Sequence, residues 1–218
     1  MNETGMIRME NVSAPIKLYR FEKSGHSHKV QLFLSLLGLP TENIDVDLLG
    51  GEQRTPAFLK MNPFGTVPVI QDGAVTVADS HAILVYLALT YADETWYPRD
   101  PQQAAQVQRW LSVSAGMLAF GPCAARLVTV FGVEFNPQEV IARAHALLSV
   151  MEQEVSERPF LTGDVPTIAD VANYAYVAHA PEGNVSLADY PHVRAWLARI
   201  EALPGFVPMP GTAIGLVA

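Results

Sequence analysis

The chain has 218 residues, of which 50% are hydrophobic and 17% are charged. This composition excludes a disordered or low-complexity protein, and the length fits one large domain or two small ones. The formal net charge of −8 argues against a nucleic-acid partner and against an anionic membrane surface, because both attract basic proteins.

The N-terminus and the cysteine content restrict the cellular setting. Residues 1–15 lack the apolar stretch of a secretory signal and are expected to form a flexible N-terminal extension. No apolar run approaches the roughly 18 residues that span a bilayer. Cys123 has no second cysteine for an intramolecular disulfide, and no Cys-x-x-Cys motif offers a zinc site. We therefore expect a soluble cytoplasmic protein without a bound metal.

Strand and helix signals alternate at the start of the chain. Residues 16–21 (IKLYRF) have the composition of a strand. Apolar residues then recur at helical spacing from Val30 to Leu37, and Gly38 ends the pattern. Residues 44–48 alternate apolar and acidic side chains, which is typical of a half-buried strand.

The same region continues with a short helix at residues 56–61 and two strands, VPVI and AVTV, on either side of Asp72-Gly73. An Asp-Gly pair between two short apolar runs is a hairpin signal. A further helix is expected from Asp79 to Tyr91. The order βαβαββα predicts a thioredoxin-like domain at residues 16–91.

Strand signals are absent beyond a linker at residues 92–101. Apolar periodicity predicts helices instead, and Thr167-Ile-Ala-Asp170 is a capping box at the start of one of them. Gly121-Pro122 is expected to kink or break the first long helix. We predict an all-helical bundle domain at residues 102–208 and a C-terminal tail at residues 209–218.

Val67-Pro68 leads the strand that follows NPFGT. Because proline has no N–H donor, Pro68 must lie at a sheet edge or face away from the ladder. A cis bond here would turn the Val67 backbone outward, leaving its N–H and C=O to pair with an extended peptide. The alternative is an ordinary turn proline.

Asp79-Ser80 stands at a predicted helix start, where free backbone N–H groups and the helix dipole favour an anion. Ser80 can donate its hydroxyl to a ligand carboxylate, and Asp79 can accept from an adjacent ammonium. The pair suits the amino-acid end of a ligand, although plain N-capping would use the same residues. All four lysines lie in the first 91 residues, which fits either an anion-receiving site or an ordinary surface; they are Lys17, Lys23, Lys29 and Lys60.

Three motifs together resemble the cytosolic glutathione S-transferase family. They are N-P-x-G-x-V-P at residues 62–68, the acid-Ser pair before a helix, and the T-x-A-D box in the helical half. The similarity covers most of the chain, and the N-terminal sequence SGHSHKVQLFLSLLGLP resembles bacterial-type, serine-type and zeta-like members. The resemblance implies that glutathione is the co-substrate and that the protein is a homodimer.

The resemblance also implies which residues hold glutathione. Val67, with Pro68 fixing its conformation, would pair with the cysteinyl backbone, and Asp79 with Ser80 would hold the γ-glutamyl end. Gln53 matches a glutamine that contacts glutathione in zeta-like members.

Ser24 in EKSGHSHKV resembles the thiol-activating serine of serine-type transferases. A hydroxyl beside a helix N-terminus can donate to a thiolate, and the helix dipole adds up to about 1 kcal/mol. Ser24 could instead be the helix N-cap, with Ser27 a competitor for either role. Other classes of the family use a tyrosine from this region, so Tyr19 is an alternative, but it lies in an apolar strand and is expected in the core. His26 and His28 could assist as bases but are expected to face solvent.

The electrophilic substrate is expected to contact the first long helix. Candidate walls are Trp110, Met117, Phe120 and Cys123. Trp110 could equally belong to the bundle core, and Cys123 is expected to be a small buried hydrophobe. Gly116 and Gly121 could open room for a substrate or allow close helix packing.

These features predict a glutathione S-transferase that uses Ser24 to hold the glutathione thiol as a thiolate for attack on a small electrophile. The same site could serve a glutathione-dependent isomerase or peroxidase. It could also belong to a non-catalytic, transferase-like binding or regulatory protein.

Overall fold

A computed structural model describes residues 14–216 of the chain, so nearly all of the predicted extension at residues 1–15 lies outside the described residues. The described chain divides into two compact units. The N-terminal unit ends at Tyr97 and also includes Pro204–Met209, whereas the helical unit comprises Pro98–Leu203 and the residues from Pro210 onward. The boundary between Tyr97 and Pro98 falls inside the predicted linker at residues 92–101.

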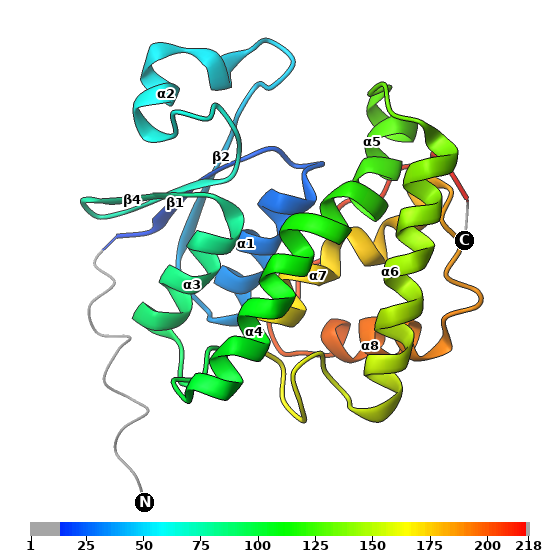
Figure 1. Ribbon diagram of the computed structural model, residues 1–218. Helices are drawn as coiled ribbons and strands as arrows, with labels where there is room; N and C mark the ends of the chain where they lie inside the picture. Colours follow the sequence, from blue (N-terminus) through cyan, green and yellow to red (C-terminus); the bar gives the residue numbers. More distant parts are fainter. Residues whose placement is uncertain (1–13, 217–218) are drawn as a thin grey trace, which may run out of the picture. The chain divides into compact units, whose positions relative to one another are not determined.

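The N-terminal unit has the predicted thioredoxin-like order of elements, with one added 3-10 turn, η3 (Figure 1). Its elements are β1 (Ile16–Arg20), α1 (Gly25–Leu36), β2 (Thr41–Asp45), η3 (Glu52–Arg54), α2 (Pro56–Met61), β3 (Val69–Asp72), β4 (Val75–Ala78) and α3 (Ser80–Tyr91). The βαβαββα prediction is therefore confirmed.

The four strands form a mixed sheet in the order β2-β1-β3-β4. β1 pairs in parallel with β2 and antiparallel with β3, so that Leu18 lies opposite both Asn43 and Ile70. The predicted hairpin joins β3 to β4, with Asp72 opposite Val75. Gly73 makes this two-residue turn possible because it adopts a positive φ of 56°.

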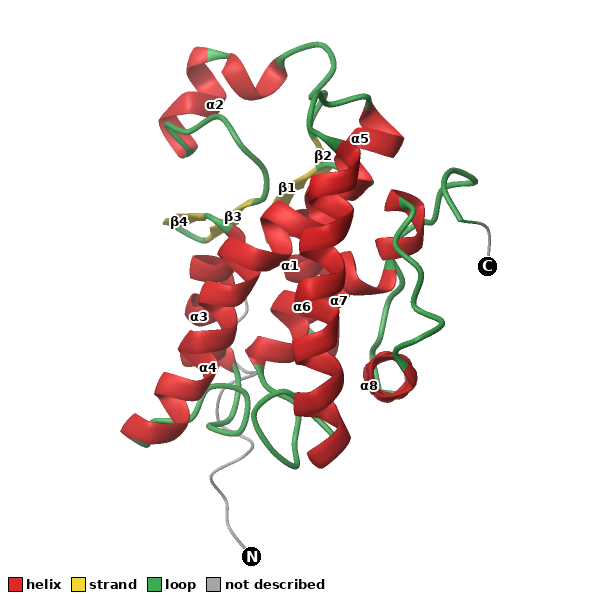
Figure 2. Ribbon diagram, turned by 45° about the vertical axis from the view of Figure 1, so that its right-hand side comes forward, coloured by secondary structure: helices red, strands yellow, loops and turns green. Residues whose placement is uncertain are grey.

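The sheet separates two sets of helices. Figures 1 and 2 show α1 and α3 side by side on one face of the sheet and α2 on the other. Buried side chains of β1 and α1 fill the first face: Ile16, Leu18, Val30 and Phe33 have no exposed surface. On the second face Phe58 of α2 packs with Val46 and Val69.

The segment 204–209 belongs to the N-terminal unit because α1 holds it through two hydrogen bonds. The Ser35 hydroxyl donates to the carbonyl of Gly205 at 2.7 Å, and Nε2 of His28 donates to the carbonyl of Val207 at 2.8 Å. Residues 204–208, predicted as the end of the helical domain, and Met209, predicted as the start of the tail, therefore belong to the N-terminal unit. The expectation that His28 faces solvent is wrong: it is 2% exposed because this segment covers it.

The helical unit has only helices as regular elements in its described residues, as predicted (Figure 2). They are α4 (Pro101–Val113), η4 (Ser114–Cys123), α5 (Ala124–Phe131), α6 (Pro137–Glu157), α7 (Ile168–Ala178), η5 (Ala180–Gly183) and α8 (Pro191–Glu201).

Of the predicted kink or break at Gly121-Pro122, the break is absent. Instead α4, η4 and α5 run without interruption from Pro101 to Phe131, and η4 is π-helical with Pro122 inside it. The N–H of Ala124 reaches back five residues to the carbonyl of Ala119. The wider turn relieves the clash that a proline ring makes with the carbonyl four residues before it.

This continuous helix is long and apolar enough to span a membrane, contrary to the expectation from the sequence. Within its most apolar window 44% of the residues are buried inside the structure. It packs against α6 and α7, and the core helix of a soluble protein can pass the same length and hydropathy test.

The predicted capping box at Thr167 and Asp170 is present and ties several parts of the helical unit together. Asp170 is 1% exposed, and its carboxylate accepts from the backbone N–H groups of Leu161 and Thr167 and from Nε1 of Trp196, each at 2.9 Å. Burial raises the pKa of Asp170, whereas these hydrogen bonds favour its ionised form.

Candidate functional site

The loop before β3 is fixed from inside by Asn62, which is 1% exposed. Its Nδ2 donates to the carbonyl and the hydroxyl of Thr66 at 2.8 and 3.0 Å, while its Oδ1 accepts from the N–H of Phe64 at 3.1 Å. Gly65 has a positive φ of 60°, and a Cβ there would lie 3.0 Å from the carbonyl oxygen of Gln53. These contacts explain the N-P-x-G spacing, whose structural role the sequence analysis did not assign.

The peptide bond between Val67 and Pro68 is cis, and Pro68 is buried. Strand pairing of β3 begins only at Val69. Within residues 14–216 no hydrogen bond joins the N–H or the C=O of Val67 to another residue. The main chain of Val67 is therefore available to an extended ligand, as the sequence analysis expected for a cis bond.

Asp79 caps α3 and remains available to a ligand. Its Oδ1 accepts from the N–H groups of His81 and Ala82 at 2.9 and 3.0 Å. The side chain is 67% exposed, and Oδ2 takes part in neither bond. Capping and ligand binding, which were alternatives in the sequence, are thus compatible. Asp79 also has a φ of 76°, a conformation that non-glycine residues rarely adopt and that recurs at functional sites.

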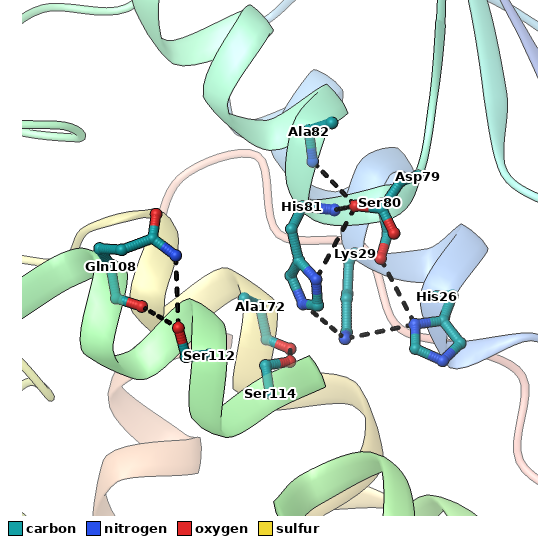
Figure 3. Close-up of polar contacts among 10 residues, drawn as sticks. All are labelled: His26, Lys29, Asp79, Ser80, His81, Ala82, Gln108, Ser112, Ser114 and Ala172. Atoms are coloured by element: carbon teal, nitrogen blue, oxygen red, sulfur yellow. Dashed lines mark hydrogen bonds and ion pairs between the residues drawn. The ribbon is translucent and has the colours of Figure 1, made fainter. Parts of the chain in front are cut away.

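A cluster of the buried Lys29 with the partly buried His26 and His81 lies beside Ser80 (Figure 3). Lys29 of α1 has no exposed surface, and its Nζ lies 3.4 Å from Nδ1 of His26 and 3.4 Å from Nε2 of His81. Nδ1 of His26 also lies 3.4 Å from the hydroxyl of Ser80, which is 3% exposed. His26 is only partly exposed, so the expectation of a solvent-facing histidine is wrong because α3 packs against it.

Both histidines of the cluster are neutral at neutral pH. Burial lowers the pKa of His26 well below 6.5, and the nearby ammonium of Lys29 lowers it further. The same two causes lower the pKa of His81 to about 4, against the opposing effect of Asp79. An ammonium can only donate hydrogen bonds, so Nδ1 of His26 and Nε2 of His81 face it as acceptors.

Ser24 is the N-cap of α1, where its Oγ accepts from the N–H of Ser27 at 3.3 Å. This bond uses a lone pair and leaves the hydroxyl proton of Ser24 for a ligand. Ser27 is 1% exposed, and its own Oγ accepts from the N–H of Phe21. The structure thus gives Ser27 a buried structural role and leaves Ser24 partly exposed at the helix start.

Tyr19 packs against the apolar cluster beneath α2, and its hydroxyl donates to Oε1 of Gln71 at 2.9 Å. This side chain is engaged within the fold, as expected for a strand residue.

Gln53 of η3 has one satisfied and one unsatisfied polar atom. Its Nε2 donates to the carbonyl of Leu48 at 3.3 Å, whereas its buried Oε1 has no hydrogen-bond partner among the described residues. A buried acceptor without a partner indicates a position that a ligand or water completes. This observation fits a glutathione contact at Gln53.

The candidate substrate residues of the helical unit divide into core and surface. Trp110 is 1% exposed and therefore lies in the core, whereas Met117 and Phe120 are 46% and 58% exposed. An open pocket of about 290 Å³ is lined by Gly116, Met117, Phe120, Arg143 and Ala146. Met117 and Phe120 are thus accessible to a ligand, and Trp110 is not.

The two glycines of η4 serve different purposes. A Cβ at Gly121 would lie 3.0 Å from the backbone nitrogen of Ala144, so Gly121 allows close packing against α6. A Cβ at Gly116 would meet nothing within 4 Å. Cys123 is 4% exposed, which confirms the expected buried thiol.

Known proteins share both units of this chain. Residues 24–90 match the family model of the glutathione S-transferase N-terminal domain, and residues 124–204 match that of the C-terminal domain. Glutathione S-transferase 3 of Zea mays is 34% identical over 217 residues, covering 90% of this chain and 96% of the relative.

Solved structures of glutathione transferases are also similar to this chain. A glutathione S-transferase from Pseudomonas fluorescens matches with a TM-score of 0.83 at 35% identity, covering 90% of this chain and 99% of that one. A glutathione transferase homolog from Drosophila mojavensis with bound glutathione matches with a TM-score of 0.79 at 31% identity, covering 87% and 89%.

The thioredoxin-like unit, the helical unit and these similarities place the chain in the glutathione S-transferase family. Within that family it is an enzyme, a glutathione transferase.

Proposed function

We propose that this enzyme binds glutathione along the N-terminal unit and activates its thiol with Ser24. The observation that carries the proposal is the main chain of Val67, whose N–H and C=O lie outside the strand pairing. A cysteinyl residue running alongside would form two backbone hydrogen bonds there. The buried Oε1 of Gln53 gives independent support, because it would accept from an N–H group of the same ligand.

The γ-glutamyl end of glutathione would lie at the start of α3. Oδ2 of Asp79 would accept from the α-ammonium, and the Ser80 hydroxyl would donate to the α-carboxylate. The positive end of the helix dipole adds to the attraction for the carboxylate. Binding of both charges of one amino acid fixes the direction in which the peptide runs.

The hydroxyl of Ser24 would donate a hydrogen bond to the glutathione sulfur and so stabilise the thiolate. A thiol with a pKa near 8.5 is only about 3% ionised at pH 7. Lowering that pKa by about 2 units, or roughly 2.7 kcal/mol, makes about three-quarters of it thiolate. A hydrogen bond to a charged group contributes about 1.5–3 kcal/mol and the helix dipole up to about 1 kcal/mol, so the two together suffice.

After the thiol proton has passed to solvent, the thiolate would attack the electrophilic carbon. The new C–S bond would either displace a leaving group, which departs with its electron pair, or open an activated double bond, whose second carbon then takes a proton from solvent. We propose Met117 and Phe120 as apolar contacts for the electrophile, because both are accessible beside the pocket of η4 and α6. We further propose that the enzyme is cytoplasmic and homodimeric.

The Ser24→Ala variant tests the proposed mechanism. We expect kcat with a chromogenic model electrophile to fall by more than tenfold, while calorimetry shows glutathione still bound. Ser149→Ala, which alters an exposed serine on α6, is the matched control. Unchanged turnover in Ser24→Ala would assign thiol activation to another group.

A further inference from the structure

Lys29 is a wholly buried cation next to the proposed glutathione site, and the mechanism above leaves it without a role. Figure 3 shows its ammonium between the rings of His26 and His81, with the Ser80 hydroxyl directed at the same nitrogen of His26. Burying an ammonium is costly, so its placement among acceptors calls for a physical account.

The key atom is Nδ1 of His26, which lies 3.4 Å from both Nζ of Lys29 and the hydroxyl oxygen of Ser80. A neutral imidazole nitrogen of this kind has one lone pair, so it accepts one strong hydrogen bond. Lys29 and Ser80 therefore compete for it. The ammonium prevails because a charge-assisted hydrogen bond is about twice as strong as a neutral one.

This competition decides what the Ser80 hydroxyl can do. When Lys29 occupies Nδ1 of His26, the Ser80 proton is left to point at a ligand. Without Lys29 the same proton would turn to His26, and a ligand carboxylate would meet a lone pair of Ser80 until that internal bond was broken.

We propose that Lys29 is a positioning residue for glutathione: by occupying Nδ1 of His26, it directs the Ser80 hydroxyl toward the γ-glutamyl carboxylate. This inference rests on the proposed binding of glutathione at Ser80. His81 holds the ammonium from the opposite side through Nε2, and the lowered pKa values of both histidines keep them available as acceptors.

The test measures glutathione affinity by calorimetry and steady-state kinetics on the full-length protein. Lys29→Met keeps the length and bulk of the side chain but removes the donor. We expect it to weaken glutathione binding about tenfold and to raise KM for glutathione more than it lowers kcat. Lys17→Met, at an exposed lysine of β1, is the matched control and should leave both values unchanged.

Two double variants separate positioning from a general effect of charge. In a Ser80→Ala background, Lys29→Met should cause no further loss, because Lys29 acts through the Ser80 hydroxyl. Adding His26→Phe to Lys29→Met should restore most of the affinity, because no acceptor then competes for that proton. A loss that persists in Ser80→Ala, or the absence of any rescue by His26→Phe, would overturn the proposal.

Thermal melts of every variant confirm that it is folded. If Lys29→Met does not fold, Lys29→Gln takes its place in both backgrounds. A smaller loss of glutathione affinity is then expected, because glutamine keeps an N–H donor. If Ser80→Ala itself leaves glutathione affinity unchanged, the proposed binding site is wrong and this inference falls with it. If Ser80→Ala weakens binding but Lys29→Met does not, only the role of Lys29 is refuted.

Discussion

The neutral histidine at position 81 predicts that the enzyme loses stability as the pH falls below neutrality. The pKa of His81 is about 4 in the folded protein and 6.5 in the unfolded chain, so below pH 6.5 the unfolded state binds more protons. Protonation therefore favours unfolding. The contribution of His81 to stability is fully present above pH 6.5 and is lost progressively as the pH falls toward 4.

The size of this effect follows from the two pKa values. Between pH 7 and pH 5 the single site costs about 2 kcal/mol of folding free energy, which for a protein of this size lowers Tm by about 4–8 °C. The His81 side chain is only 14% exposed, so screening by solvent is limited. His26, whose pKa is lowered for the same reasons, acts in the same direction.

The assay is urea unfolding at pH 5, 6 and 7 for the wild type, His81→Asn and His192→Asn. His81→Asn should lose about 2 kcal/mol less than the wild type between pH 7 and pH 5, because asparagine does not titrate. His192 is an exposed residue of α8, so its variant should follow the wild type. Equal pH dependence in His81→Asn and the wild type would refute the assigned charge state of the cluster.

Four further substitutions, one of them a control, have defined outcomes. Asn62→Ala removes the internal hydrogen bonds of the loop before Val67, and we expect a lower Tm together with a raised KM for glutathione in steady-state assays. Asp170→Ala leaves buried N–H donors without an acceptor and should cost about 3 kcal/mol or more in urea unfolding. Gly121→Ala presses a methyl group onto the α6 backbone and should cost about 1–3 kcal/mol, whereas Gly116→Ala, with open space around it, should cost nothing measurable in the same melts.

The sequence was sufficient to predict a structural element where the signal lay in neighbouring residues. The Asp72-Gly73 hairpin and the Thr167 capping box each rest on neighbouring residues, and both are present. The bond between Val67 and Pro68 is cis, but β3 begins at Val69, two residues after the predicted strand start. Gly121-Pro122 shows the limit of a local rule. Proline disrupts an α-helical turn, but the wider π-helical turn accepts it, and packing against α6 stabilises that choice.

The buried cluster could not be predicted because distant residues create it. In α1, Lys29 lies one helical turn before Phe33 and so belongs to the apolar face, yet a lysine there is normally interpreted as surface. Its burial depends on His81, 52 residues further along the chain. The return of residues 204–209 to α1 is likewise a long-range contact that no periodicity indicates.

Because residues 204–209 return to the N-terminal unit, this unit is formed by two separate segments of the chain. The polypeptide leaves the N-terminal unit after Tyr97 and contributes to it again with Pro204–Met209, so the bulk of the helical unit is in effect an insertion into the thioredoxin-like fold. A protein truncated at residue 97 would leave Nε2 of His28 and the hydroxyl of Ser35 without their carbonyl acceptors. Exchange of the helical unit would therefore have to preserve the short peptide that follows it, since Pro204–Met209 completes the first unit.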